Sequence, residues 1–169
     1  EMTVEEAMYD YDKCYAAWKK FVLDYDPDGH MGCAGPGPGK FYEILDYKLY
    51  AWPGHGVSPE HPYQCLEGEY MKADEYDAFI HDPLYFFYYT WPSRVFGALE
   101  PLATLPHLSG LTEMYGVAAS FVPYGLPPVQ AAYKALLEAG SEALKWFGAV
   151  SPFDKEMPEL GWPAYHAFA

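Results

Sequence analysis

Two histidine–cysteine pairs are the metal-type ligands that stand out in the sequence. His30 lies three residues before Cys33, and His61 lies four residues before Cys65. Two imidazoles and two thiolates form a suitable tetrahedral set for zinc. The ligand order within each pair is the reverse of the common zinc-finger order, and the spacing does not require the two pairs to meet. We therefore expect no metal cofactor in this chain, and we keep this His/Cys set as the alternative.

Acid/base chemistry has two sources in the sequence. The segment 67–77 is dense in carboxylates, a pattern that is more typical of a solvated face than of a catalytic pair. Arg94 is the only arginine and stands among aromatic and apolar neighbours. A guanidinium in such company pairs with a carboxylate. An internal Asp or Glu is the favoured partner of Arg94, and a substrate acid is the alternative.

Two loop motifs resemble ligand sites but lack essential residues. Residues 24–29 (DYDPDG) match the first half of a calcium loop, but the twelfth position is Gly35 instead of the bidentate Glu. Residues 35–40 (GPGPGK) lack the first glycine of a phosphate-binding loop, and Phe41 stands where that loop needs Ser or Thr. The sequence therefore favours neither calcium nor nucleotide binding.

The elements that must position these side chains are mostly helical. Thr3 and Glu6 form a capping-box pattern that begins a helix, and this helix is expected to run to Pro27. The glycine-rich segment 29–39 indicates a loop or a short strand. Short strands are expected over 47–52 and 63–66, in a small hairpin-like unit.

The second half of the chain is expected to be helical and interrupted by proline. Asp82 followed by Pro83 is typical of a helix N-terminus, and Gly148 and Gly161 are expected to end helices. Ser151 is expected to cap the last helix. The expected helices cover 75–81, 84–91, 93–105, 109–119, 128–147 and 152–160. In the longest of them one apolar face is predicted to contain Val129, Ala132, Tyr133, Leu136, Leu137, Gly140, Ala143, Leu144 and Phe147.

Composition limits the class of protein and its partners. The chain has 169 residues, 51% of them apolar, which is enough for one unit with its own core, over residues 1–169. The net charge of −14 leaves no basic cluster for phosphates, so we expect neither a nucleic-acid nor an anionic-membrane partner. The three cysteines form no C-x-x-C pair, and no apolar run or leader suggests export. Reduced thiols in a cytoplasmic protein are therefore expected.

Several stretches together resemble the uroporphyrinogen decarboxylase-like family, in particular its corrinoid-linked methyltransferase branch. The resemblance extends over about residues 5–165. Its motifs are 52–56 (WPGHG), 67–71 (EGEYM), 74–77 (DEYD) with 82–83 (DP), 94–102 (RVFGALEPL), 125–130 (GLPPVQ) and 135–140 (ALLEAG).

This resemblance implies a (β/α)₈ TIM barrel, which needs about 250 residues or more. The chain is thus expected to be mostly α with a few short strands, an early-to-middle section of such a barrel with a helical insertion. The zinc-binding residues of the methyltransferase members lie toward the C-terminal end, which this sequence does not reach. Zinc and a corrinoid, with a corrinoid protein as partner, are therefore expected only for a longer parent.

Two functions follow as alternatives. In the first, the parent transfers a methyl group from a small methylated compound to a corrinoid carrier, or decarboxylates a porphyrinogen-like acid; this chain alone would be inactive. His55, Tyr70 and Arg94 are then the candidates that line the substrate pocket, because they supply a glycine-flanked imidazole, a phenol and the lone guanidinium. In the second, the chain is a non-catalytic helical interaction module. An incomplete barrel section exposes apolar edges, so self-association is expected.

Overall fold

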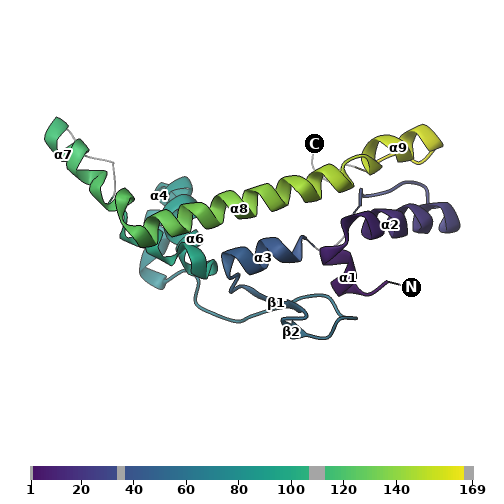
Figure 1. Cartoon of the computed structure of the whole chain (residues 1–169), viewed down its shortest axis with the longest axis horizontal. Helices are drawn as coiled ribbons and strands as arrows, with labels where there is room; N and C mark the ends of the chain where they lie inside the picture. The colour runs from purple at the N-terminus through teal and green to yellow at the C-terminus, as the bar shows by residue number, and fades with distance from the viewer. Residues whose placement is uncertain (1, 34–36, 107–112, 166–169) are drawn as a thin grey trace. The chain divides into compact units, whose positions relative to one another are not determined.

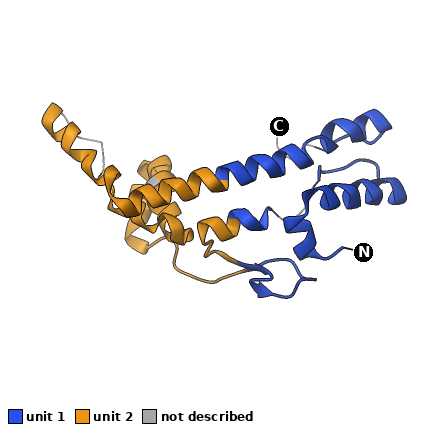
Figure 2. Ribbon diagram, in the orientation of Figure 1, with its two compact units in different colours: residues 1–41, 51–64, 140–169 blue, residues 42–50, 65–139 orange. Residues whose placement is uncertain are grey.

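The computed structural model describes residues 2–33, 37–106 and 113–165. The chain is mostly helical with one small sheet, as the sequence predicts (Figure 1). Contacts group it into two compact units, a finer division than the single unit expected from its length. Unit 1 comprises residues 1–41, 51–64 and 140–169, and unit 2 comprises residues 42–50 and 65–139 (Figure 2).

Unit 1 begins with two helices where the sequence predicts one. Helix α1 covers Val4–Tyr9 and helix α2 covers Tyr11–Tyr25. The predicted capping box is present, because Thr3 Oγ1 accepts from the Glu6 backbone N–H and Glu6 Oε2 accepts from the Thr3 backbone N–H. The helix breaks at Asp10, whose carboxylate caps α2 by accepting from the Lys13 N–H at 2.9 Å. A side-chain cap thus competes with the continuous helical ladder.

The core of unit 1 lies between α2, the end of helix α8 (Pro127–Val150) and helix α9 (Phe153–Leu160). Phe153 and Met157 are fully buried in it. Gly161 ends α9 in the left-handed conformation at φ +108°, as predicted. The predicted Ser151 cap is wrong, because Pro152 is the N-cap residue and makes no side-chain hydrogen bond.

A three-stranded sheet follows the short helix α3 (Gly39–Leu45). Its strands are β1 (Tyr50–Pro53), β2 (Gly56–Val57) and β3 (Gln64–Cys65), in the order β2-β1-β3. The predicted strands overlap β1 and β3. Strand β2 was not predicted, and it pairs with β1 in parallel. This pairing needs a tight turn, which Gly54 and Gly56 allow at φ +79° and +91°.

Before α8, the helices of unit 2 are short and irregular. In chain order these are η1 (Ala73–Glu75), α4 (Tyr76–His81), α5 (Pro83–Tyr85), η2 (Phe86–Thr90), α6 (Trp91–Val95), η3 (Gly97–Thr104), α7 (Met114–Ser120) and η4 (Val122–Gly125). Asp82 caps α5 with Pro83 at the first turn, as predicted. The helices predicted over 84–91 and 93–105 are each divided into shorter helices in the structure. Part of the predicted helix 109–119 lies outside the described residues.

The segment η2 is a π-helix, and Pro92 explains it. Proline has no N–H to donate to the carbonyl four residues earlier. The N–H of Trp91 reaches back five residues, to the Phe86 carbonyl. Ser93 Oγ donates to the Thr90 carbonyl at 2.8 Å. The wider turn is therefore accommodated by neighbouring hydrogen bonds.

Helix α8 covers Pro127–Val150 and is longer than predicted, because it continues through Gly148. The predicted apolar face is buried only in part. Val129 and Ala132 are buried, whereas Leu137 and Leu144 are each 72% exposed. Small residues permit close packing, so the alanine-rich side is covered in place of the leucine-rich side. Within the described part of the chain, no helix is both long and apolar enough to cross a membrane.

Candidate functional site

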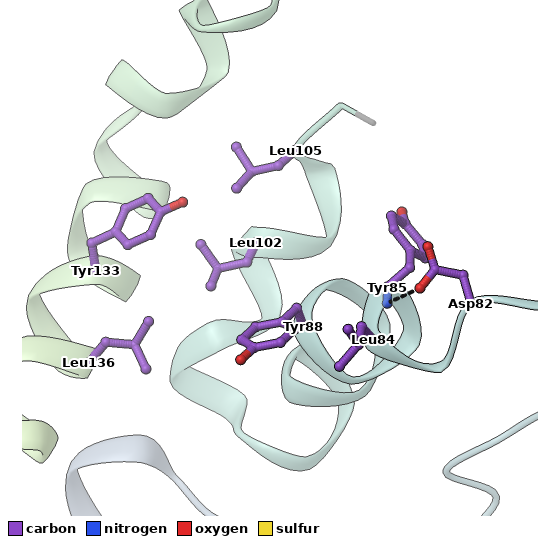
Figure 3. Close-up of a pocket in the computed structure, with 8 residues that line it drawn as sticks. All are labelled: Asp82, Leu84, Tyr85, Tyr88, Leu102, Leu105, Tyr133 and Leu136. Carbon is purple, nitrogen blue, oxygen red and sulfur yellow. Dashed lines mark hydrogen bonds between the residues drawn. The ribbon is translucent and has the colours of Figure 1, made fainter. Parts of the chain in front are cut away.

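Unit 2 contains a cavity of about 560 Å³. Its size falls within the range of small-molecule sites in proteins. Four leucines, three tyrosines and one aspartate line it: Asp82, Leu84, Tyr85, Tyr88, Leu102, Leu105, Tyr133 and Leu136 (Figure 3).

Two walls of the cavity come from distant parts of the sequence. Tyr133 and Leu136 are three residues apart on α8 and therefore share a face of the helix. Leu102, from η3, and Leu105 lie opposite them (Figure 3). The Tyr133 ring stacks on Tyr124 at 6.3 Å between centroids, which fixes its orientation.

The remaining wall depends on the π-helix and on the cap of α5. Tyr88 lies within η2, so the wide turn determines where its ring stands. Asp82 Oδ1 accepts from the Tyr85 N–H at 3.0 Å, which fixes the start of α5 (Figure 3). Behind this wall Phe86 is 6% exposed and packs edge-on against Phe79 at 5.4 Å. Strained or irregular helical turns of this kind are frequent at functional sites.

The chemistry of the lining defines what it accepts. Leucine side chains and aromatic rings favour an apolar ligand, and phenol groups add a few hydrogen-bonding positions. Asp82 is the one formally charged residue in this lining. Tyrosine rings also attract cations. The lining therefore suits a neutral or cationic small molecule better than an anion.

Arg94 lines an adjoining cavity of about 380 Å³, which shares Tyr85, Leu102 and Leu105 with the first. Its guanidinium holds Glu75 with both terminal nitrogens; Nη1 donates to Glu75 Oε2 at 2.7 Å, and Nη2 donates to Oε1. This ion pair lowers the pKa of Glu75 to about 2. The prediction of an internal carboxylate partner is confirmed. The guanidinium is thus already engaged by protein groups.

Tyr70 lies next to Arg94, but its phenol does not line a pocket as predicted. Its backbone carbonyl accepts from Arg94 Nη1 at 3.0 Å. Its phenol donates to the carbonyls of Leu66 at 3.0 Å and of Lys48 at 3.2 Å. Tyr70 lines neither of the two cavities in the described part of unit 2. Its side chain therefore holds the segment before η1 in place.

His55 belongs to unit 1, where it stands in the turn between β1 and β2. Its ring stacks on Trp52 at 4.6 Å, and its Nε2 lies 3.3 Å from the Tyr9 hydroxyl. The glycines on either side of it adopt the positive φ angles that the turn requires. Gly54 is also packed so closely that a Cβ would lie 2.5 Å from a Glu5 oxygen. The glycines beside His55 therefore allow close packing within the chain, and not the close approach of a ligand that the sequence suggested.

The alternative zinc set does not assemble. Among residues 2–33, 37–106 and 113–165, no three or more His, Cys, Asp or Glu side chains are placed to hold a metal ion. Cys33 instead lies beside Cys14, and His30 Nδ1 accepts from the Gly32 N–H at 3.0 Å. Cys65 is exposed, as is His61.

Sequence reasoning missed most of the cavity lining. Of the predicted pocket residues, Arg94 lines the adjoining cavity. Tyr133 and Leu136 line the first cavity but were predicted only as members of the apolar face of a helix. The usable signal is Pro92 directly after an aromatic run, because it predicts a disturbed helix that cannot pack as a regular one.

Comparisons with protein-family models, curated proteins and solved structures found no match for this chain.

Proposed function

We propose that unit 2 binds a small, mostly apolar molecule, neutral or positively charged, in the 560 Å³ cavity. The observation that carries this proposal is the convergence of four leucines and three tyrosines on one space, with Asp82 as its charged group. Burial of apolar ligand surface supplies the affinity at about 25 cal/mol per Å² before the costs of association.

The wider proposal is that the chain is the substrate-binding section of a uroporphyrinogen decarboxylase-like barrel enzyme. Methyl transfer from a small methylated compound to a corrinoid carrier is then favoured over decarboxylation. A porphyrinogen-like polycarboxylate needs cationic partners, and Arg94 is committed to Glu75. The groups that bind corrinoid and zinc would lie in the parent, outside this chain.

A neutral fluorescent probe tests the cavity directly. N-phenyl-1-naphthylamine increases its fluorescence on entering an apolar site, and its titration gives a Kd. Leu136→Trp places a larger ring in the lining and should weaken binding by about tenfold, which is about 1.4 kcal/mol. Leu137→Trp is the matched control, because Leu137 is the neighbouring residue and is 72% exposed. Equal affinity in the two variants would contradict the proposal.

We further propose self-association as a second function, on a separate observation. Leu144 and Phe147 lie three residues apart on the part of α8 that belongs to unit 1, and they are 72% and 56% exposed. Apolar residues gathered on one exposed face favour contact with a partner. Helix α8 carries two Lys and two Glu, so a second copy meets no net charge there despite the −14 of the chain.

Sedimentation across a concentration series tests this second proposal. Leu144→Glu should shift the protein toward monomer, whereas Ala131→Glu adds the same charge at another exposed position of α8 and should not. A wild-type chain that stays monomeric at high concentration would count against it.

A further inference from the structure

Two buried cysteines face each other in the core of unit 1. Cys14 comes from α2, and Cys33 lies 19 residues later, in the segment after that helix. Their Sγ atoms are 4.0 Å apart. The two residues are 1% and 9% exposed, and they pack in one cluster with Val22, Phe153 and Met157.

We propose that Cys14 and Cys33 form an oxidisable dithiol site, which a peroxide converts into an intramolecular disulfide between α2 and the segment that contains Cys33. The site lies in unit 1 and is independent of the ligand proposed for unit 2.

The geometry favours this bond over oxidation of either thiol alone. The sulfur atoms are already in contact and must close to about 2.05 Å, which requires only a short approach. A disulfide has no hydrogen to donate, so it leaves no polar group unsatisfied in the apolar cluster. The contact between the two sulfur atoms also makes the thiols unequal, because it lowers the pKa of the Cys14 thiol and raises the pKa of the Cys33 thiol. Cys14 is thus the better nucleophile.

The reaction balances in two steps. The Cys14 thiol releases its proton, the thiolate attacks one oxygen of hydrogen peroxide, and the O–O bond breaks. Cys14 becomes a sulfenic acid, and the other oxygen leaves as hydroxide, which takes up the released proton to form water. The Cys33 sulfur then attacks the Cys14 sulfur, the S–O bond breaks, and the second oxygen leaves as water with the Cys33 proton. Two thiols are oxidised, and one peroxide is reduced to two waters.

Burial determines which reagents reach the pair. Hydrogen peroxide is small and uncharged, whereas alkylating reagents need more room and an exposed thiolate. Cys65 is the exposed thiol. In the folded, reduced protein we therefore expect iodoacetamide to label Cys65 and to leave Cys14 and Cys33 unmodified.

The experiment uses the full chain with Cys65→Ser, which removes the exposed thiol at a surface position. The protein is treated with hydrogen peroxide, denatured, alkylated and analysed by peptide mass spectrometry without reduction. We expect a cross-linked peptide pair that contains Cys14 and Cys33, with the loss of two alkylation sites and their return after dithiothreitol. Two free thiols, separate sulfinic acids, or cross-links between two chains would each overturn the proposal.

Thermal unfolding gives a second readout that does not depend on mass spectrometry. A bond across 19 residues constrains the unfolded chain, so the oxidised protein should melt higher by roughly 10 °C. Dithiothreitol should reverse the shift. Cys14→Ser and Cys33→Ser, each with Cys65→Ser, should show no peroxide-dependent rise. An unchanged or lower midpoint in the oxidised dithiol protein would contradict the claim that the folded core accommodates the bond.

Discussion

The two units use polar and aromatic residues in opposite ways. In unit 1 they are paired between regular helices: Tyr11 donates to Glu142 at 2.7 Å, and Tyr15 and Lys19 both contact Glu156. In unit 2, Phe87 and Tyr88 are 52% and 74% exposed on an irregular segment beside an open cavity. The first arrangement stabilises a fold, and the second leaves surface available for a ligand.

Proline explains much of this difference. Pro83 begins α5, Pro92 follows the π-helix and Pro101 lies inside η3, so unit 2 has no long helix before α8 within its described residues. Short helices bury their apolar residues incompletely. Helix α2 has no proline and runs for 15 residues. Most of the cavity lining therefore comes from the segment that proline keeps irregular, and the regular helix α8 supplies only Tyr133 and Leu136.

The largest expected effect is in the core of unit 1. Phe153→Ala removes a side chain that is 0% exposed and should lower the free energy of unfolding by about 3–5 kcal/mol. Phe87→Ala in unit 2 removes a ring of the same size that is 52% exposed, and it should cost about 1 kcal/mol or less. Urea denaturation measures both. Similar losses would mean that the two units are packed alike.

A smaller loss of stability is expected where a phenol donates a hydrogen bond to a buried carboxylate. Tyr11→Phe removes the donor to Glu142, which is 7% exposed, and should cost about 2 kcal/mol. This hydrogen bond also lowers the pKa of Glu142, which would rise in the variant. Tyr88→Phe, at an exposed phenol of unit 2, should change stability by less than about 0.5 kcal/mol. Urea denaturation of both variants at neutral pH measures the two losses in the free energy of unfolding. A larger loss for Tyr88→Phe than for Tyr11→Phe would refute the prediction.

The smallest effect concerns the ion pair of unit 2. Arg94 lowers the pKa of Glu75 from 4.5 to about 2, so the pair stabilises the fold above pH 4.5 and this contribution is lost as the pH falls through 2. In Glu75→Gln the stability difference from wild type should therefore shrink between these pH values. Arg94→Gln should remove the same pH dependence. A difference that stays constant over this window would show that the ion pair contributes nothing.

Local signals in the sequence predicted local structure well. The capping box of Thr3 and Glu6 and the Asp82–Pro83 helix start are confirmed, because each depends on residues a few positions apart. The extent of α8 was also largely predicted. Periodicity identifies the apolar face of a helix but does not show whether that face is covered, and Leu137 and Leu144 on the predicted face are exposed.

The candidate site was harder to predict because it depends on contacts between distant residues. Tyr133 and Leu102 are 31 positions apart and meet only once η3 and α8 are placed. Cys14 and Cys33 form no motif, yet Cys14 of α2 lies beside Cys33 in the core. The partner class of Arg94 was predictable, since a guanidinium among apolar residues requires a carboxylate, but the identity of Glu75 was not.

The central claim is that the cavity of unit 2 binds a small neutral or cationic molecule. Methyl NMR spectra of leucine-labelled protein, recorded during titration with N-phenyl-1-naphthylamine, test where such a molecule binds. The claim predicts saturable shifts of the Leu102, Leu105 and Leu136 methyl signals, with Leu137 and Leu144 unaffected. Shifts confined to Leu137 and Leu144, or no saturable shift at all, would contradict it.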